Sequence, residues 1–254
     1  MISGTEAKMK ELKKLIRRDC RILKARAPKR IAILLAVLVA IAVMAGAFGK
    51  TEIFIKGITG ETAELVRENL KNIPVLWIMI KLGGVFVLYD FVYDDLYYFS
   101  SGLFARLGRR KNFWRSKILT TGCTCLLLSL LLMLVNMLVF AVFAGGMSRE
   151  SLAICTASFV YDFVGIYTGA CVFHLASCLG GKAVGFLLTL LLLCCGMFSG
   201  SGYLLINHIM PARISEAAGM DLIGVIYGIA IICIVALAGD IAISKKDFLN
   251  HKEV

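Results

Sequence analysis

The sequence predicts an all-α membrane protein with six transmembrane helices, an amphipathic helix before them and a re-entrant segment before the last span. Of the 254 residues, 59% are hydrophobic, against roughly 45–50% in soluble domains. The mean hydropathy is +0.83, and charged residues make up only 18% of the chain and gather in short segments. These observations exclude a soluble globular domain.

Six apolar runs have the length that a spanning helix requires. About 20 apolar residues are needed, because a helix rises ~1.5 Å per residue, the hydrocarbon core is ~30 Å thick and the backbone must satisfy its own hydrogen bonds. The predicted spans are residues 31–49, 74–93, 118–146, 152–179, 183–206 and 222–239. They define a transmembrane domain over residues 31–244, followed by a cytoplasmic tail over residues 245–254.

The distribution of Lys and Arg predicts the orientation, because positive loops stay on the cytoplasmic side. With the N-terminus inside, 21 of the 28 Lys and Arg lie in cytoplasmic segments, six lie in outer segments and Lys81 lies within a span. Both termini are therefore predicted to be cytoplasmic. The nine cysteines lie almost entirely in spans or on the cytoplasmic side, as expected of small apolar side chains and not of disulfides.

Residues 1–30 are predicted to form a basic amphipathic helix. Its apolar positions recur at spacings of three and four, with most of the cations elsewhere on the helix. These positions are Met9, Leu12, Ile16, Cys20 and Leu23. Such a helix lies in the headgroup plane, where each cation near an anionic surface contributes about 1 kcal/mol. It either anchors the first span or docks a cytoplasmic partner.

The predicted cytoplasmic segment from residue 94 to residue 117 combines cations with large aromatic side chains, the composition that protein interfaces favour. Its candidate contact residues are Tyr97, Phe104, Arg106, Arg109, Arg110 and Trp114. The alternative is a loop that only sets the topology, with aromatic side chains anchored at the lipid interface. Nucleic acid is not expected as a partner, because no RNA-binding motif or second basic face accompanies the segment.

Two outer segments have their own patterns. Residues 61–73 are predicted to form a short helix with Ala63, Val66, Leu70 and Ile73 on one side, which caps the bundle. Between the last two spans, Gly200, Gly202 and Pro211 interrupt an apolar run that is too long for one span and too short for two. A re-entrant or broken helix fits this run, because irregular backbone is tolerated at membrane depth only where protein or water covers it.

Lys81 and Asp162 are charges within predicted spans, and each costs about 2.5–3.5 kcal/mol near the membrane centre on insertion scales. Counted from the outer ends of their spans, their depths differ by only about 5 Å. We therefore hypothesise that they pair between the second and fourth spans. In the alternative, Lys81 reaches to the outer surface and Asp162 faces a subunit interface.

Catalytic and metal-binding signatures are not found in the sequence. The segment ASCLGGKA has Ala176 and Ala183 where a phosphate-binding loop needs glycine and a hydroxyl residue, so ATP hydrolysis is not expected of this chain. Ser201 with His208 lacks the context of a serine protease, and the cysteines lack zinc-site spacing. No enzyme activity, bound cofactor or metal is predicted.

The order of these features resembles the ABC-2-type permeases, the transmembrane subunits of ABC transporters. The most specific stretch is LFARLGRRKNFWRSKIL, which is similar to the family's pattern of apolar residue, Arg, small residue, Arg, aromatic residue and Lys at the start of the third span. The resemblance covers the whole chain. Permeases of this length belong to exporters of bacteriocins and other amphipathic antimicrobial peptides, or to systems giving resistance to them.

The resemblance implies that the chain pairs with a second permease copy or a homologous permease and binds separate ABC ATPase subunits, which bind ATP and Mg²⁺. The contact residues named above would then couple the ATPase to the bundle, and Gly200, Gly202 and Pro211 would belong to an outer gate. A bacterial plasma membrane is the expected location. Two alternatives remain open: an ATPase-independent immunity or interaction protein that binds a peptide or lipid, and an intramembrane enzyme or ion-coupled carrier.

Overall fold

The computed structural model describes residues 2–97, 110–143, 146, 148–199, 204–213 and 222–245. Within these ranges all regular structure is helical and no strand occurs. The predicted all-α class is therefore confirmed.

Four described helices are long and apolar enough to cross a membrane, which fits a multi-pass membrane protein. These helices are α1 (Ile2–Ala47), α7 (Arg110–Phe143), α8 (Arg149–Gly180) and α11 (Leu222–Lys245). They contain the predicted first, third, fourth and sixth spans. Helix α7 begins eight residues before its predicted span and takes up the basic segment Arg110–Lys117, because its buried aromatic side chains pack into the bundle.

The predicted second and fifth spans are shorter as helices than expected. Helix α4 (Val75–Val87) has 13 residues and α9 (Lys182–Phe198) has 17, so they rise only about 20 Å and 26 Å. After α4 the backbone turns at Leu88–Val92 before α5 (Tyr93–Tyr97) begins. By length and composition the structure thus supports four of the six predicted spans.

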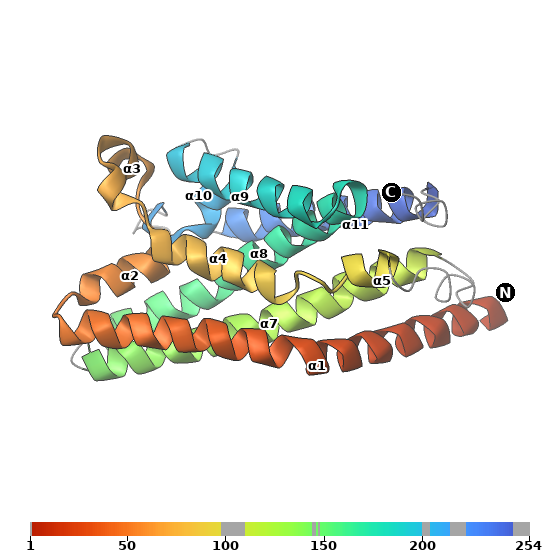
Figure 1. Ribbon diagram of the computed structural model, residues 1–254, viewed down its shortest axis with the longest axis horizontal. Coiled ribbons are helices and arrows are strands. Elements are labelled where there is room, and N and C mark those ends of the chain that lie inside the picture. The colour runs from red at the N-terminus through yellow and green to blue at the C-terminus, as the bar shows by residue number, and fades with distance from the viewer. Residues whose placement is uncertain are drawn as a thin grey trace.

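Helix α1 joins the predicted amphipathic segment and the first predicted span into one helix of 46 residues, about 69 Å long. Pro28 lies inside it, where proline removes one backbone hydrogen bond. Figure 1 shows α1 running along the whole length of the bundle. The basic segment thus continues the axis of the span and does not turn away from it.

The buried face of this segment agrees only in part with the predicted one. Leu15, Asp19, Leu23 and Ala27 are buried at a spacing of four residues, whereas Met9 is 55% exposed. Of the predicted positions, Leu23 is buried and Leu12, Ile16 and Cys20 are half-buried, so the buried side is shifted from the predicted one, which was based on apolar residues and did not include Asp19. The neighbouring helices instead select the face that carries this carboxylate.

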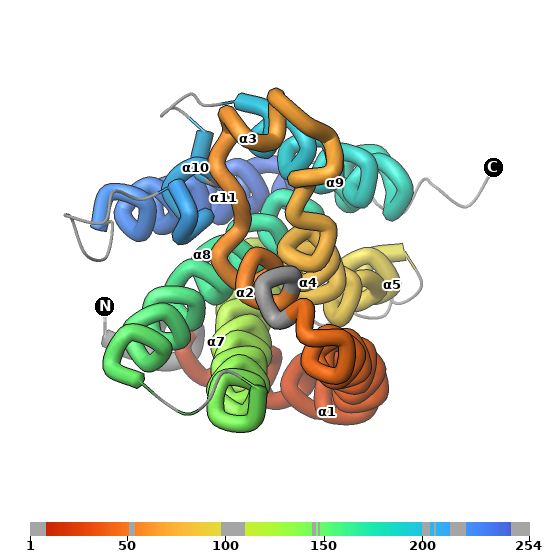
Figure 2. Tube along the Cα trace, turned by 90° about the vertical axis from the view of Figure 1, so that its left-hand side faces the viewer, coloured from red at the N-terminus to blue at the C-terminus, as the bar shows by residue number. Residues whose placement is uncertain are grey.

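Helix α8 is central in the bundle and contacts α4, α7, α9 and α11, while α1 packs on α4 and α7 (Figure 2). The beginning of α1 and the end of α11 lie at the same end of the bundle, and α7 begins there too (Figure 1). The main core includes fully buried side chains of several helices, such as Leu88, Leu128, Ile166 and Phe173.

The opposite end carries the short helices α2 (Thr51–Thr59), α3 (Ala63–Glu68), η1 (Leu70–Asn72), α10 (Leu205–Ile209) and η2 (Pro211–Arg213). The Thr62 side chain accepts a hydrogen bond from the Leu65 amide and so caps α3. The predicted helix over residues 61–73 is thereby divided at Asn69. Ala63 and Val66 are buried as expected, but Leu70 is 67% exposed, and α2 was not predicted.

Candidate functional site: a buried charge cluster joining α1, α5 and α7

Five side chains form a buried charge cluster at the end of the bundle where α1 and α7 begin. They are Arg18 and Asp19 of α1, Asp95 of α5, and Ser116 and Lys117 of α7. Side chains of Asp19 and Lys117 are 0% exposed and that of Asp95 is 8% exposed. The cluster thus brings together positions almost 100 residues apart in sequence.

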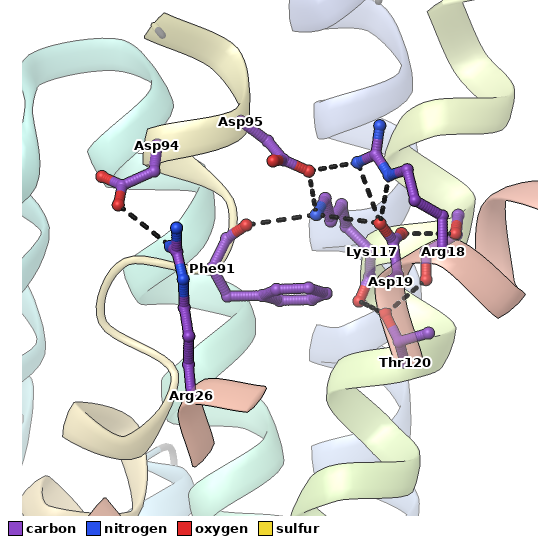
Figure 3. Close-up of polar contacts among 9 residues, drawn as sticks. Arg18, Asp19, Arg26, Phe91, Asp94, Asp95, Lys117 and Thr120 are labelled. Atoms are coloured by element: carbon purple, nitrogen blue, oxygen red, sulfur yellow. Dashed lines mark hydrogen bonds and ion pairs between the residues drawn. The ribbon is translucent and has the colours of Figure 1, made fainter. Parts of the chain in front are cut away.

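Lys117 is the centre of the cluster (Figure 3). Its Nζ donates to Asp95 Oδ2 at 2.6 Å, to the Phe91 carbonyl at 3.1 Å and to Asp19 Oδ1 at 3.2 Å. The ammonium also lies 3.7 Å from the centroid of the Phe91 ring, within the range of a cation–π contact. All three N–H groups of the ammonium therefore have acceptors.

Arg18 and Ser116 complete the cluster. Arg18 donates to Asp19 Oδ1 at 2.9 Å and also contacts Asp95, while the Ser116 hydroxyl donates to Asp19 Oδ2 at 2.6 Å. Two cations and two carboxylates balance in charge. Desolvation offsets much of the attraction in such a site, but removing one partner leaves an uncompensated buried charge and is strongly destabilising. The cluster therefore fixes which faces of α1 and α7 meet.

Two further carboxylates close to Asp95 in the sequence, Asp90 and Asp94, pair with cations of other helices. Asp90 pairs with Arg30 of α1, and Lys182 at the start of α9 contacts Asp90 at 3.2 Å and Asp94 at 2.7 Å. Arg26 of α1 lies 3.2 Å from Asp94. Asp90 and Asp94 therefore each have cations of both α1 and α9 as partners.

The sequence DFVYDD, residues 90–95, supplies all three carboxylates. Asp90 lies in the turn between α4 and α5, and Asp94 and Asp95 lie in the first turn of α5. Each of the three pairs with an arginine of α1; Asp90 and Asp94 also contact Lys182 of α9, and Asp95 contacts Lys117 of α7. We call these three residues the acidic turn. It connects the cations of α1, α7 and α9, so this end of the bundle is held by charge as well as by apolar packing.

The structure describes three of the six candidate ATPase contact residues. Tyr97 stacks on Tyr93 with ring centroids 4.1 Å apart, and Arg110 begins α7 and is half-buried. Phe104, Arg106 and Arg109 lie outside the described residues.

Trp114, the third described candidate, lies inside the bundle and does not present a surface to a partner. It is 0% exposed, and its Nε1 donates to the Ala236 carbonyl of α11 at 3.0 Å. Its ring fills the space beside Gly239, where an added Cβ would lie 2.0 Å from Trp114 Cε2. Its place in a basic and aromatic segment suggested a contact with a partner. In the structure, the Trp114 side chain instead packs against α11.

Lys81 and Asp162 form an ion pair between α4 and α8, with Lys81 Nζ 2.5 Å from Asp162 Oδ1. Lys81 also donates to the Tyr161 carbonyl at 3.2 Å. The Lys81 and Asp162 side chains are 2% and 9% exposed, so the ammonium does not reach the surface. This pair is buried separately from the charge cluster.

At the opposite end, Pro211 begins η2, and Gly200 and Gly202 lie outside the described residues. Arg213 of η2 donates to the carbonyls of Gly196 at 2.8 Å and Met197 at 2.6 Å, near the end of α9. It also donates to the Glu61 carbonyl at 3.0 Å. One guanidinium thus satisfies carbonyls that the helix end leaves unpaired and joins three segments.

The sequence reasoning did not find the charge cluster. It counted Lys117 among the cytoplasmic cations of the segment from residue 94 to residue 117 and gave Asp19 no role. A signal was present, since Asp19 is one of only two carboxylates between residues 8 and 30 and lies four residues from both Leu15 and Leu23. Ion pairing of this kind positions helices and offers no nucleophile or metal site, and the described residues contain no group of three potential metal ligands.

Comparisons with known protein families, with curated proteins and with solved structures give no match to this chain.

Proposed function

We propose that this chain is the permease subunit of an ATP-driven ABC exporter that moves amphipathic or antimicrobial peptides out of the cell. Separate ATPase subunits would bind ATP and Mg²⁺ and supply the energy. Four long apolar helices and a sequence without a phosphate-binding loop support a transport subunit that relies on a partner. The resemblance of LFARLGRRKNFWRSKIL to the permease pattern supports the particular class.

The charge cluster is the observation that carries the proposal. It joins α1 to Asp95 of the acidic turn and to α7, and α5 and α7 are the described helices that precede and follow residues 98–109 in the chain. A partner that pushes on this segment would move the three elements together, because the buried charges resist separation. Rigid-body movement of helices would then pass to α8 and α11, with which α7 is in contact.

The proposed transmembrane arrangement has six crossings, with both termini in the cytoplasm of a bacterial cell. Each of the shorter helices, α4 and α9, would complete its crossing with the residues that follow it. Chain direction supports this reading, because successive helices run in alternating directions along the bundle (Figure 1). A second permease, identical or homologous, would pack beside this one.

The outer gate is proposed to consist of α10, η2 and the glycines before them. Ile209 and Met210 are 2% and 0% exposed, so this segment inserts among α8, α9 and α11 as a re-entrant element would. The contacts of Arg213 with α9 would hold it closed.

The decisive experiment is affinity purification of the tagged chain from its native membrane in mild detergent, with partners identified by mass spectrometry. We expect a stoichiometric ABC ATPase. Reversing the charges of Arg106, Arg109 and Arg110 to Glu is expected to release it while membrane insertion is unchanged.

The matched control reverses three exposed cations of the opposite end, Lys50, Lys71 and Arg149, and is expected to retain the ATPase. If a folded, intact chain reproducibly brings down no ATPase, the exporter proposal is wrong. The ATPase-independent immunity or interaction protein would then be the better reading. Equal loss of the ATPase in both triple variants would refute the proposed docking end.

A further inference from the structure

A cavity of about 250 Å³ lies beside Lys81 among α4, α8, α9, α10 and α11. Helix α8 lines it with small side chains, including Gly165, Thr168 and Gly169. Leu192 of α9 and Tyr227 of α11 also line it and are 41% and 37% exposed. Figure 2 shows α9 and α11 apart from one another, with α8 between and below them. Because these two lining side chains are partly exposed, the cavity opens on the side of the bundle, where a bilayer would cover it, and we call it the lateral cavity.

Two buried polar groups in the lining have unused hydrogen-bonding capacity. Lys81 donates to Asp162 and to the Tyr161 carbonyl, and its Nζ lies 5.2 Å from the centroid of the Trp77 ring. Among the described residues, one of its three N–H groups therefore has no oxygen acceptor. Its ammonium lies against the cavity wall, since a Cβ built on Gly165 would be 3.3 Å from Nζ. Thr168 is 4% exposed, and its hydroxyl has no hydrogen-bond partner in the described part of the chain. A buried polar group without a partner costs free energy, so both groups favour an occupant that accepts hydrogen bonds.

The charge balance indicates that the occupant is neutral. Lys81 already has a carboxylate partner, so an added anion would leave one uncompensated negative charge in a buried site, which is costly. An uncharged carbonyl oxygen accepts from an ammonium or a hydroxyl without that cost. The rest of the lining is mostly aliphatic, with Val85, Leu193 and Ile209 among its members, and suits an apolar chain.

The volume limits the size of the occupant. A cavity of ~150 Å³ holds one benzene molecule, so on the order of ten non-hydrogen atoms fit in the lateral cavity by simple proportion. That is one medium-length acyl chain with its carbonyl group. Entry from the side, between α9 and α11, suits a molecule dissolved in the bilayer.

We propose that the lateral cavity is a binding site for a single uncharged acyl chain, whose carbonyl oxygen accepts hydrogen bonds from Lys81 and Thr168. The chain would lie along the small side chains of α8, with its tail between α9 and α11. Binding here requires no ATPase and does not depend on the proposed transport function.

The test uses the full chain in lipid nanodiscs and a photoreactive diazirine analogue of methyl octanoate, with labelled residues mapped by mass spectrometry. We expect labelling at the cavity lining, including Val172, Leu192 and Ile231, above the background at lipid-facing positions such as Leu134 and Leu138 of α7. Methyl octanoate is expected to compete better than octane, which lacks the carbonyl, and better than octanoate, which is charged.

Two variants with matched controls test the site itself. Gly169→Leu fills the cavity and is expected to remove the site labelling, whereas Ala153→Leu, at an exposed position of α8, should retain it. Thr168→Val keeps the side-chain shape and is expected to weaken competition by methyl octanoate about fivefold through the lost hydrogen bond. The control Thr156→Val, also exposed on α8, should leave competition unchanged.

Labelling that is equal in wild type and Gly169→Leu would overturn the proposal. Wild-type competition that does not distinguish methyl octanoate from octane would also overturn it. So would methyl octanoate competing equally well in the wild type and in Thr168→Val. If Gly169→Leu fails to fold, Thr168→Val still tests the site, because valine has nearly the same shape as threonine and adds no volume.

Discussion

Replacing Lys117 by methionine tests whether the charge cluster holds the bundle together. Methionine keeps an apolar stem of similar length but removes a charge whose Nζ has three oxygen acceptors at 2.6–3.2 Å. Asp19 and Asp95 would then share only Arg18, which leaves one uncompensated negative charge in a buried site. Breaking a buried ion pair in this way typically costs about 3–5 kcal/mol. For a chain of this size, that corresponds to a fall in Tm of about 10 °C.

The unfolding temperature can be measured in detergent with a maleimide dye that becomes fluorescent on reacting with thiols. Cys125, Cys155 and Cys171 are buried thiols, so their reaction reports unfolding of the bundle. The matched control is Lys111→Met, an exposed lysine of the same helix, for which we expect little change.

A double-mutant cycle isolates the interaction. Asp95→Asn combined with Lys117→Met removes one charge of each sign and leaves the Arg18–Asp19 pair balanced. We expect the double variant to be less destabilised than the sum of the single variants, with a coupling free energy of about 1–3 kcal/mol. Strict additivity, or a Tm for Lys117→Met no lower than that of Lys111→Met, would refute the assignment.

Three further predictions concern other parts of the bundle. Reversing either charge of the Lys81–Asp162 pair is expected to reduce the yield of monodisperse protein in size-exclusion chromatography, and the double exchange Lys81→Asp with Asp162→Lys should restore it; no recovery would contradict pairing. Gly239→Leu is expected to destabilise the fold by about 1–3 kcal/mol and to shift the emission of Trp114, since the new side chain meets its ring; unchanged emission would count against that contact. Arg213→Gln should speed hydrogen exchange in α10, because several hydrogen bonds to carbonyls are lost, and unaltered exchange would show that the guanidinium does not hold the segment.

Composition and periodicity predicted the helical class and the approximate positions of the long helices. The predicted span over residues 152–179 differs from α8 by only three residues at its start and one at its end. Such agreement follows from the long uninterrupted apolar run, since the backbone of an apolar segment must satisfy its hydrogen bonds internally. Helix lengths were less predictable at residues 74–93, where the chain turns after Val87 although the residues up to Tyr93 are mostly apolar.

Local patterns could not predict which side of a helix faces the bundle. On α1, apolar periodicity favoured the side with Met9 and Leu12, whereas the structure buries the side with Asp19. A carboxylate becomes suitable for burial only when cations from other segments meet it, and Lys117 lies 98 residues further along the chain. The same reason explains Trp114, which resembled an interface residue in sequence but packs beside Gly239 of α11.

The sequence by itself determined that this protein is helical and rich in membrane-length apolar segments, because both properties depend on residues close together in the chain. Only the tertiary structure decided how charges are neutralised within it. Ion pairs such as Asp19 with Lys117, and cavities such as the one beside Lys81, depend on side chains that distant segments bring together. Their energies come from burial and from the opposite charge nearby, neither of which exists until the helices have packed.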